Sequence, residues 1–591
     1  MITVAKPACK FGNKNLAARR DSVCETSRFL AQELAMNFRN IRRGLVLTLA
    51  FVSMTGCGKS GSSLPPAPAG ASAISPDTTV RVHWLGKIGM QLRMNSYYLM
   101  RIWQLQVTDD LQTRTLSRLA TAPSRWLAVP PERAQLANGL VNASLKDIVL
   151  CECYLEVRQP TNQPAELAFA IHLDADGVGN WETNLANIVG LLAGEWPTPA
   201  SDGQRGWSLH RAQPPNLLQF QRVKDWAVFG AGAGSNSVFN EICDRVRHYR
   251  DPFAAMTSTN WLEADLAPSR LADAFSLSAR GAGGEGRGEV GAKIVSSLSH
   301  VTLAISGDGA NVLTRGKLTF PGPMPVDYGP WRFPTNLIPG TLNSFTAVRG
   351  LRPWLSSLKV WNDLPIGAPP DQLFLWAVPG QASQAYFVAP SSDAGNQVNR
   401  LTEYLLARTN PWLATNGYVQ FERLPESNGV SWGNMPSIRP FIKFAGTAGG
   451  GAVFGGLLPD TTPGTNLQNN LYQRPARSRL FEEISAQTNL VYYDWELTAT
   501  RIDPCLYLGQ VARVVSRHAQ LPLETASLKW LRAVEPGLGS STTMIVGTGT
   551  NQLAFSRKSS VGFTAAELQL LADWLESPLF PDGLYSLPTP P

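Results

Sequence analysis

Cysteine and histidine are scarce in this chain, which holds seven cysteines and six histidines among 591 residues. Cys151 and Cys153 lack the CxxC or histidine-rich spacing that metal and redox sites use. Their spacing of two instead places both on one face of a strand, where cysteine behaves as a small apolar side chain. A disulfide between distant cysteines stays open, because its pairing does not follow from sequence. We therefore expect no metal and no cofactor.

An excess of positive or negative charge is also missing once the first 57 residues are set aside. Those residues hold nine of the 52 Lys and Arg and three of the 45 Asp and Glu, which leaves 43 basic and 42 acidic residues. A nearly neutral chain has no electrostatic footprint for a polyanion. The composition therefore excludes nucleic acid as a partner.

The apolar run near the start of the chain, Gly44 to Met54, is too short for a membrane span. A helix needs roughly 20 apolar residues to cross a bilayer, and this run has the length of a signal-peptide core. It follows the basic cluster Arg39, Arg42 and Arg43, as signal peptides do, and Met36 directly before that cluster is the expected true start. The sequence therefore predicts export.

The sequence Met54-Thr55-Gly56-Cys57 closes this run and resembles a bacterial lipobox. The resemblance implies that Cys57 is acylated and becomes the first residue, which anchors the protein in a membrane of the cell envelope. Gly58, where an aspartate would retain the protein at the inner membrane, implies the outer membrane, with the body in the periplasm. The alternative is an ordinary cleaved signal peptide with a chance cysteine. We assign 1–57 to targeting and the Gly/Ser/Pro-rich stretch 58–74 to a flexible tether.

Four short motifs occur twice in the same order, about 216 to 240 positions apart. The pairs are Asp176 to Asn180 with Asp393 to Asn396, Trp226 to Gly230 with Gly451 to Gly455, Glu263 to Leu266 with Asp494 to Leu497, and Gly307 to Leu313 with Gly547 to Leu553. We predict two homologous halves, 75–321 and 341–591, joined by a Pro-rich linker at 322–340.

Short strands and helices mix in both predicted halves. Because strand pairs outnumber strand–helix–strand units, the pattern favours an α+β fold in which each half is a largely antiparallel sheet with helices packed on it. A helical insertion around Tyr97 to Asn138 is expected in the first half alone.

Several local signals fix where elements begin and turn. Gly-x-Gly-x-Asn supplies the positive φ of a tight turn, so hairpins are expected at 301–320 and 542–556. Asn180 and Asn396 are the expected N-caps of two helices. Thr564 to Glu567 forms a capping box before the last helix.

Four runs resemble a family of exported proteins from environmental Gram-negative bacteria. They are VHWLGK at 82–87, RPWLSSLK at 352–359, NLVYYDWE at 489–496 and LLADWLESP at 570–578. The resemblance spans nearly all of the chain after the tether. It implies export and implies no activity.

Two acidic pairs are the most informative charged feature. Alternate residues of a strand point to one side, as a general acid/base pair or a cation site requires. Arg270 and Arg501 follow the two pairs and favour a second interpretation, a solvated strand face with structural ion pairs. The candidate residues are Glu263, Asp265, Asp494 and Glu496.

Three functions stay open on this sequence. The absence of any Ser/His/Asp, Cys/His or metal constellation favours a lipid-anchored, non-enzymatic envelope protein that binds or scaffolds an unknown partner. The second is a hydrolase of envelope or imported polymer that uses the acidic pairs. The third is a periplasmic carrier of lipid or hydrophobic peptide. A polar cleft at Glu263 or Asp494 would favour the hydrolase, and an apolar groove between sheet and helices would favour the carrier.

Overall fold

The computed structural model describes residues 75–581, apart from 160–164, 201–204, 213–214, 233–235, 250–251, 254–258, 271–297, 358–366, 380–384, 416, 418, 425–427, 434–438, 448, 458–474, 516–523 and 579. The predicted targeting segment, Cys57 and the tether therefore lie outside the described residues.

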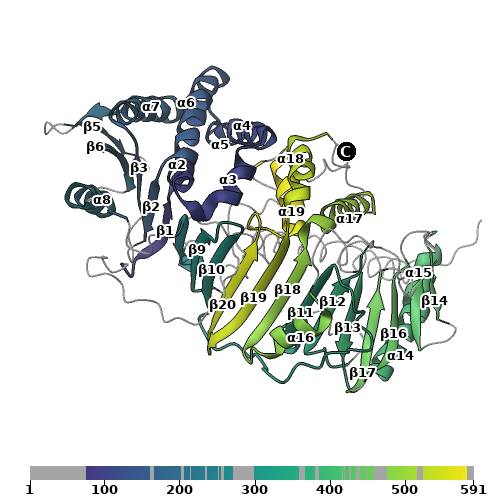
Figure 1. The fold of residues 1–591 in the computed structure, drawn as a ribbon. Coiled ribbons are helices and arrows are strands. Elements are labelled where there is room, and N and C mark those ends of the chain that lie inside the picture. The colour runs from purple at the N-terminus through teal and green to yellow at the C-terminus, as the bar shows by residue number, and fades with distance from the viewer. Residues whose placement is uncertain are drawn as a thin grey trace, which may run out of the picture.

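The strands of the described chain pair antiparallel throughout and form one continuous sheet (Figure 1). In chain order they are β1 (Thr78–Trp84), β2 (Cys153–Arg158), β3 (Glu166–His172), β4 (Thr198–Pro199), β5 (Gly206–Ala212), β6 (Pro215–Val223), β7 (Trp226–Gly232), β8 (Leu262–Leu266), β9 (His300–Gly307), β10 (Val312–Thr319), β11 (Ser344–Arg349), β12 (Gln372–Ala377), β13 (Tyr386–Pro390), β14 (Phe421–Arg423), β15 (Gly429–Trp432), β16 (Phe441–Thr447), β17 (Gly450–Gly456), β18 (Leu490–Leu497), β19 (Ser540–Gly549) and β20 (Gln552–Ser559). The α+β class with antiparallel pairing is confirmed. The expectation of a separate sheet in each half is wrong, because β10 pairs with β20 along its whole length.

The strand order repeats on the two sides of that β10–β20 pair. Outward from β10 it is β10, β9, β8, β1, β2, β3, β7, β6, β5, β4. Outward from β20 it is β20, β19, β18, β11, β12, β13, β17, β16, β15, β14. Each place is filled by a strand whose number is higher by ten.

Helices cover both faces of the sheet around β3 and β7. Side chains alternate along a strand, so Ala168 and Ala170 of β3 pack against α8 (Ser237–His248), while Phe169 and Ile171 pack toward α7 (Ala175–Ala193). We call these the α8 face and the α7 face. A strand buried on both faces reads as an apolar run rather than an alternating one. In the second set α14 (Ala394–Tyr404) follows β13 as α7 follows β3, and α16 (Arg477–Ser485) follows β17 as α8 follows β7.

A block of helices separates β1 from β2, which confirms the predicted insertion. It comprises α2 (Gly86–Gln91), the short helix η1 (Met94–Ser96), α3 (Tyr97–Trp103), α4 (Gln106–Ala120), α5 (Ala122–Trp126) and α6 (Pro131–Leu150). Between β11 and β12 the described residues hold α12 (Arg352–Ser357).

The remaining helices lie in the second half of the chain. Beyond α14 the chain continues through η2 (Leu405–Thr409) and α15 (Asn410–Thr415). η3 (Thr498–Arg501), α17 (Ile502–Val515), α18 (Ala526–Val534), η4 (Glu535–Gly537) and α19 (Ala565–Leu575) follow β18 or β20. Ile102 of α3 shares a core with Leu531 of α18 and Leu568 of α19, so the insertion and the C-terminal helices pack together (Figure 1).

Both predicted hairpins are present. β9 pairs with β10, and β19 pairs with β20, each antiparallel around the Gly/Asn turn. Gly309 has a φ of +92°, which requires glycine at the first turn. The N-cap predictions are wrong: α7 follows Asp174, whose carboxylate accepts from the Gly177 N–H at 2.7 Å, and α14 follows Asp393. Asn180 and Asn396 lie inside these helices, because each helix starts within a few residues of the end of its strand.

The two acidic pairs lie on equivalent strands, β8 and β18, but not at equivalent positions. Directly opposed residues of antiparallel strands share a face. One such row runs across the sheet through Asp494, Thr543, Arg557, Thr314, Ile305, Leu262, Trp84, Cys153 and Ile171. Asp494 therefore belongs to the α7 face, whereas Glu263, next to Leu262, points to the α8 face. The expected equivalence of Glu263 and Asp494 is wrong, because a shift of one residue exchanges the faces of a strand.

Candidate functional site

Asp494 and Glu496 of β18 point to the α7 face beneath α19. Their residues are 7% and 1% exposed. The predicted solvated strand face is therefore wrong for this pair. The reason is non-local, since the helix that covers it begins at Ala565, about seventy residues further along the chain.

Three donors fill the Glu496 carboxylate. Its Oε1 accepts from the Thr498 hydroxyl at 3.0 Å and from the Ala565 backbone N–H at 2.7 Å, and its Oε2 pairs with the Arg501 guanidinium. Ala565 is the first residue of α19, so the carboxylate also meets the positive end of the helix dipole. The predicted ion pair with Arg501 is confirmed, and the hydrogen bond from the Ala565 N–H to the same carboxylate fastens the start of α19 to the sheet.

Arg557 of β20 lies in the same row as Asp494 and forms a second buried ion pair. It contacts both carboxylate oxygens of Glu567 on α19, at 2.5 and 2.7 Å, and donates to the Thr543 hydroxyl at 2.9 Å. Glu567 also completes the predicted capping box with Thr564. Bidentate contact gives this pair a fixed geometry.

The Thr346 hydroxyl donates a hydrogen bond to the Asp494 Oδ1 at 2.6 Å. Burial, reinforced by the nearby Glu496 carboxylate, raises the pKa of Asp494 to about 6. The carboxylate form is disfavoured because it loses water and faces a like charge. A raised pKa is one mark of a catalytic acid. Whether Asp494 is catalytic or structural therefore depends on whether a substrate can reach it.

Glu263 and Asp265 are buried as well, on the other face of the sheet. Asn260 donates to Glu263 at 2.5 Å, and the His300 Nε2 lies 2.6 Å from the Asp265 Oδ1. The hydrogen bond to Asp265 raises the pKa of His300. The solvated face predicted for this pair is also wrong.

The ion pair expected between Arg270 and the first acidic pair does not form. Arg270 donates to the backbone carbonyl of Gln159 at 2.6 Å and lies 3.7 Å from Asp77. Asp77 directly precedes β1 and Gln159 directly follows β2, so neither partner belongs to β8.

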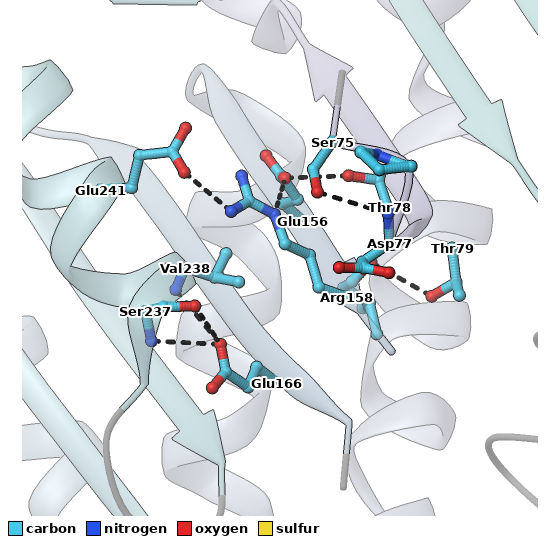
Figure 2. Close-up of polar contacts among 12 residues, drawn as sticks. Ser75, Asp77, Thr78, Thr79, Glu156, Arg158, Glu166, Ser237, Val238 and Glu241 are labelled. Atoms are coloured by element: carbon cyan, nitrogen blue, oxygen red, sulfur yellow. Dashed lines mark hydrogen bonds and ion pairs between the residues drawn. The ribbon is translucent and has the colours of Figure 1, made fainter. Parts of the chain in front are cut away.

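A further polar cluster lies under α8, and sequence reasoning missed it (Figure 2). Glu156 of β2 accepts from the hydroxyls of Thr78 at 3.2 Å and Tyr154 at 2.6 Å, and from Arg158 at 2.6 Å. Arg158 also pairs with Glu241 of α8 at 2.7 Å. Burial alone would lower the pKa of Arg158, but its hydrogen bonds to Glu241 and Glu156 raise it. The cluster fastens α8 to β2.

Glu166 performs a similar task at the start of α8. Its Oε2 accepts from the Ser237 hydroxyl at 2.6 Å and from the Ser237 N–H at 3.1 Å (Figure 2). A carboxylate at a helix N-terminus satisfies backbone donors that have no partner within the helix. Each buried carboxylate described so far therefore has structural partners, and the two candidate pairs lie on opposite faces of the sheet.

An apolar pocket of about 320 Å³ lies on the α7 face beside the helical insertion. Its walls come from β1, β2 and β3 and from α3 and α6, and the side chains that line it are apolar. The lining residues are Val82, Trp84, Trp103, Ile148, Val149, Cys153, Leu155 and Phe169. The volume is at the lower end of ligand pockets, which span roughly 300–1,000 Å³. Its chemistry suits a hydrocarbon chain and offers no group for acid/base work.

The pocket residues carried no sequence signal of their own. Cys153 was expected to be a buried apolar side chain, and it is buried. The others look like ordinary strand and helix core positions, because a pocket arises where packing is incomplete and not from a residue type. In the described part of the chain, no group of three or more His, Cys, Asp or Glu could hold a metal ion.

Comparison with known proteins does not show a family for this chain. No family model matches the chain, and no curated protein matches it. Two solved structures, crystal forms IV and III of TP0453, are 9% and 10% identical, with TM-scores of 0.19 and 0.20. They cover 44% and 46% of this chain and 81% and 79% of their own. Likeness at this level carries no argument about fold or function. Within the described residues, none of the helices combines the length and the apolar character that crossing a membrane takes.

Proposed function

We propose that this chain is a lipid-anchored protein of the cell envelope whose folded body binds a partner rather than catalyses a reaction. The observation that carries the second part is the burial of all four candidate carboxylates. Asp494 and Glu496 lie beneath α19, and Glu263 and Asp265 face the opposite side, each with structural partners. A hydrolase would need at least one such pair open to its substrate.

The lipid anchor rests on the lipobox-like sequence that ends at Cys57. In cells fed a labelled fatty acid, the protein should carry the label, and Cys57→Ser should remove it completely because the lipobox cysteine that would carry the acyl chains is gone. Cys151→Ser is the matched control, because Cys151 stays in the mature chain and lies outside the lipobox, and it should keep the label. Label that persists in Cys57→Ser would contradict the anchor.

We also propose that the chain arose by duplication of a ten-stranded unit. The repeated strand order supports this, as do the matching positions of α7 and α14, and of α8 and α16. The proposed units are 75–321 and 341–591, with 322–340 as the linker. An experimental structure in which the two units fail to superpose strand by strand would contradict the proposal.

The apolar pocket favours a second candidate function, a carrier of a hydrophobic ligand. Its wholly apolar walls fit the earlier criterion of a groove between sheet and helices. Each buried methylene contributes about 0.8 kcal/mol, so the length of a bound chain should control its affinity.

Two variants test the pocket in opposite directions. Leu155→Phe narrows it and should shift the preference of the protein toward shorter fluorescent fatty acids, whereas Phe169→Ala widens it and should favour longer ones. Affinities are read by fluorescence titration over a series of chain lengths. An unchanged chain-length preference in both variants would rule out this pocket as the ligand site.

A further inference from the structure

The segment from α2 to the start of α3 exposes large apolar side chains in close succession. Ile88, Leu92, Met94 and Tyr97 are 51%, 85%, 89% and 60% exposed. Single exposed apolar residues are ordinary on protein surfaces. Four within ten positions, on short helices that contact one another, form the kind of apolar surface that marks a contact site.

The same segment is basic. No Asp or Glu occurs from Thr78 to Thr108, whereas Lys87, Arg93 and Arg101 surround the apolar residues. The Lys87 ammonium lies 5.2 Å from the centre of the Trp103 ring, and the Arg101 guanidinium lies 6.0 Å from that of Tyr97. Lys87 and Arg101 are thus held beside aromatic rings of the same segment.

The turn between β9 and β10, which packs against this segment, adds no carboxylate without a cationic partner. The Asn95 carbonyl accepts from the Gly309 N–H at 2.9 Å, and the neighbouring Asp308 is paired with Lys558 at 2.8 Å. A surface segment in which exposed apolar side chains alternate with cations has the composition that binds the interface of an anionic membrane.

We propose that the segment Ile88 to Tyr97 docks on an anionic membrane surface, with Leu92 and Met94 entering the interface between headgroups and acyl chains. This inference rests on the proposed lipid anchor for its setting. Residues 58–74 span at most roughly 60 Å when extended, so an anchor at Cys57 keeps the described body within reach of the bilayer. The contact itself belongs to the protein surface and needs no acyl group.

The test uses the mature chain carrying Cys57→Ser, which cannot be acylated. The protein should sediment with vesicles of phosphatidylethanolamine and phosphatidylglycerol and much less with vesicles of phosphatidylcholine. The double variant Leu92→Ser/Met94→Ser should weaken binding at least about tenfold, because two apolar side chains lose their place in the interface. Arg93→Gln should weaken binding to the anionic vesicles and reduce its sensitivity to added salt.

The control is Leu457→Ser/Tyr507→Ser, which removes two exposed apolar side chains from the second half of the chain and should bind as the parent does. Unfolding curves of all variants establish that each one folds. No binding to anionic vesicles, or equal binding by Leu92→Ser/Met94→Ser, would overturn the proposal. So would a parent that forms dimers which this variant abolishes, since a second copy would then be the occupant. Because acylation is absent throughout, these results do not depend on the fatty-acid labelling of Cys57.

Discussion

Replacing Arg557 by methionine should lower the free energy of unfolding by about 3–5 kcal/mol, because one partner of a buried ion pair is removed while the other stays buried. Glu567 would lose both of its guanidinium contacts, and Asp494 would lose a nearby positive charge. The capping box of α19 would weaken with them, since Glu567 belongs to both. Urea unfolding at neutral pH, followed by circular dichroism, measures the loss.

Two further variants show whether the loss comes from the buried pair. Arg557→Met/Glu567→Gln should recover part of the stability, because no unpaired charge is left in the interior. Arg423→Met removes an exposed pair with Glu403 and should cost about 0–1 kcal/mol. If Arg557→Met cost no more than Arg423→Met, the pair would not be holding α19 on the sheet.

Asp494→Asn should make the protein more stable at pH 7, by roughly 1–3 kcal/mol. A carboxyl whose pKa is raised to about 6, from an ordinary value of 3.8, is a carboxylate at pH 7 only at a cost in folding free energy. Asparagine keeps the shape and can still accept the Thr346 hydroxyl, and it carries no charge to repel Glu496. The measurement is urea unfolding of both proteins at pH 7. If Asp494 were catalytic, this substitution would abolish an activity.

Local signals predicted the parts of the fold that local chemistry decides. The Gly/Asn turn between β9 and β10 and the capping box at Thr564 depend on neighbouring residues, and both are present. Asp174 rather than Asn180 caps α7, because β3 ends at His172 and the helix begins soon after it. Element boundaries of this kind depend on where the preceding strand stops, which a pattern of residue types does not determine.

Contacts between segments far apart in the chain explain the predictions that were wrong and the features that were not predicted. Glu263 and Asp494 begin matching sequence motifs, yet the register of the strands puts them on opposite faces of the sheet. A shift of one residue is enough to exchange the faces of a strand. Glu496 reads as a surface carboxylate until α19 is placed over it. The same holds for the partners of Glu567 and for the apolar pocket, which bring together segments far apart in the chain. Lipidation at Cys57 stays a prediction, because it falls outside the described residues.

The central claim is that the candidate carboxylates are buried in the folded body rather than open to a substrate, and the pH dependence of Asp494→Asn tests it most directly. Free energies of unfolding are measured from about pH 4 to pH 7 for the parent and the variant. Below the ordinary pKa of aspartate both proteins are neutral at this position, so the two curves should meet near pH 4. Between about pH 4 and pH 6 the parent loses stability that the variant keeps, because the folded state still holds the proton that the unfolded state has released, and above about 6 the difference levels off. A parent that gains stability over this range relative to the variant, or two curves that run parallel, would contradict the account.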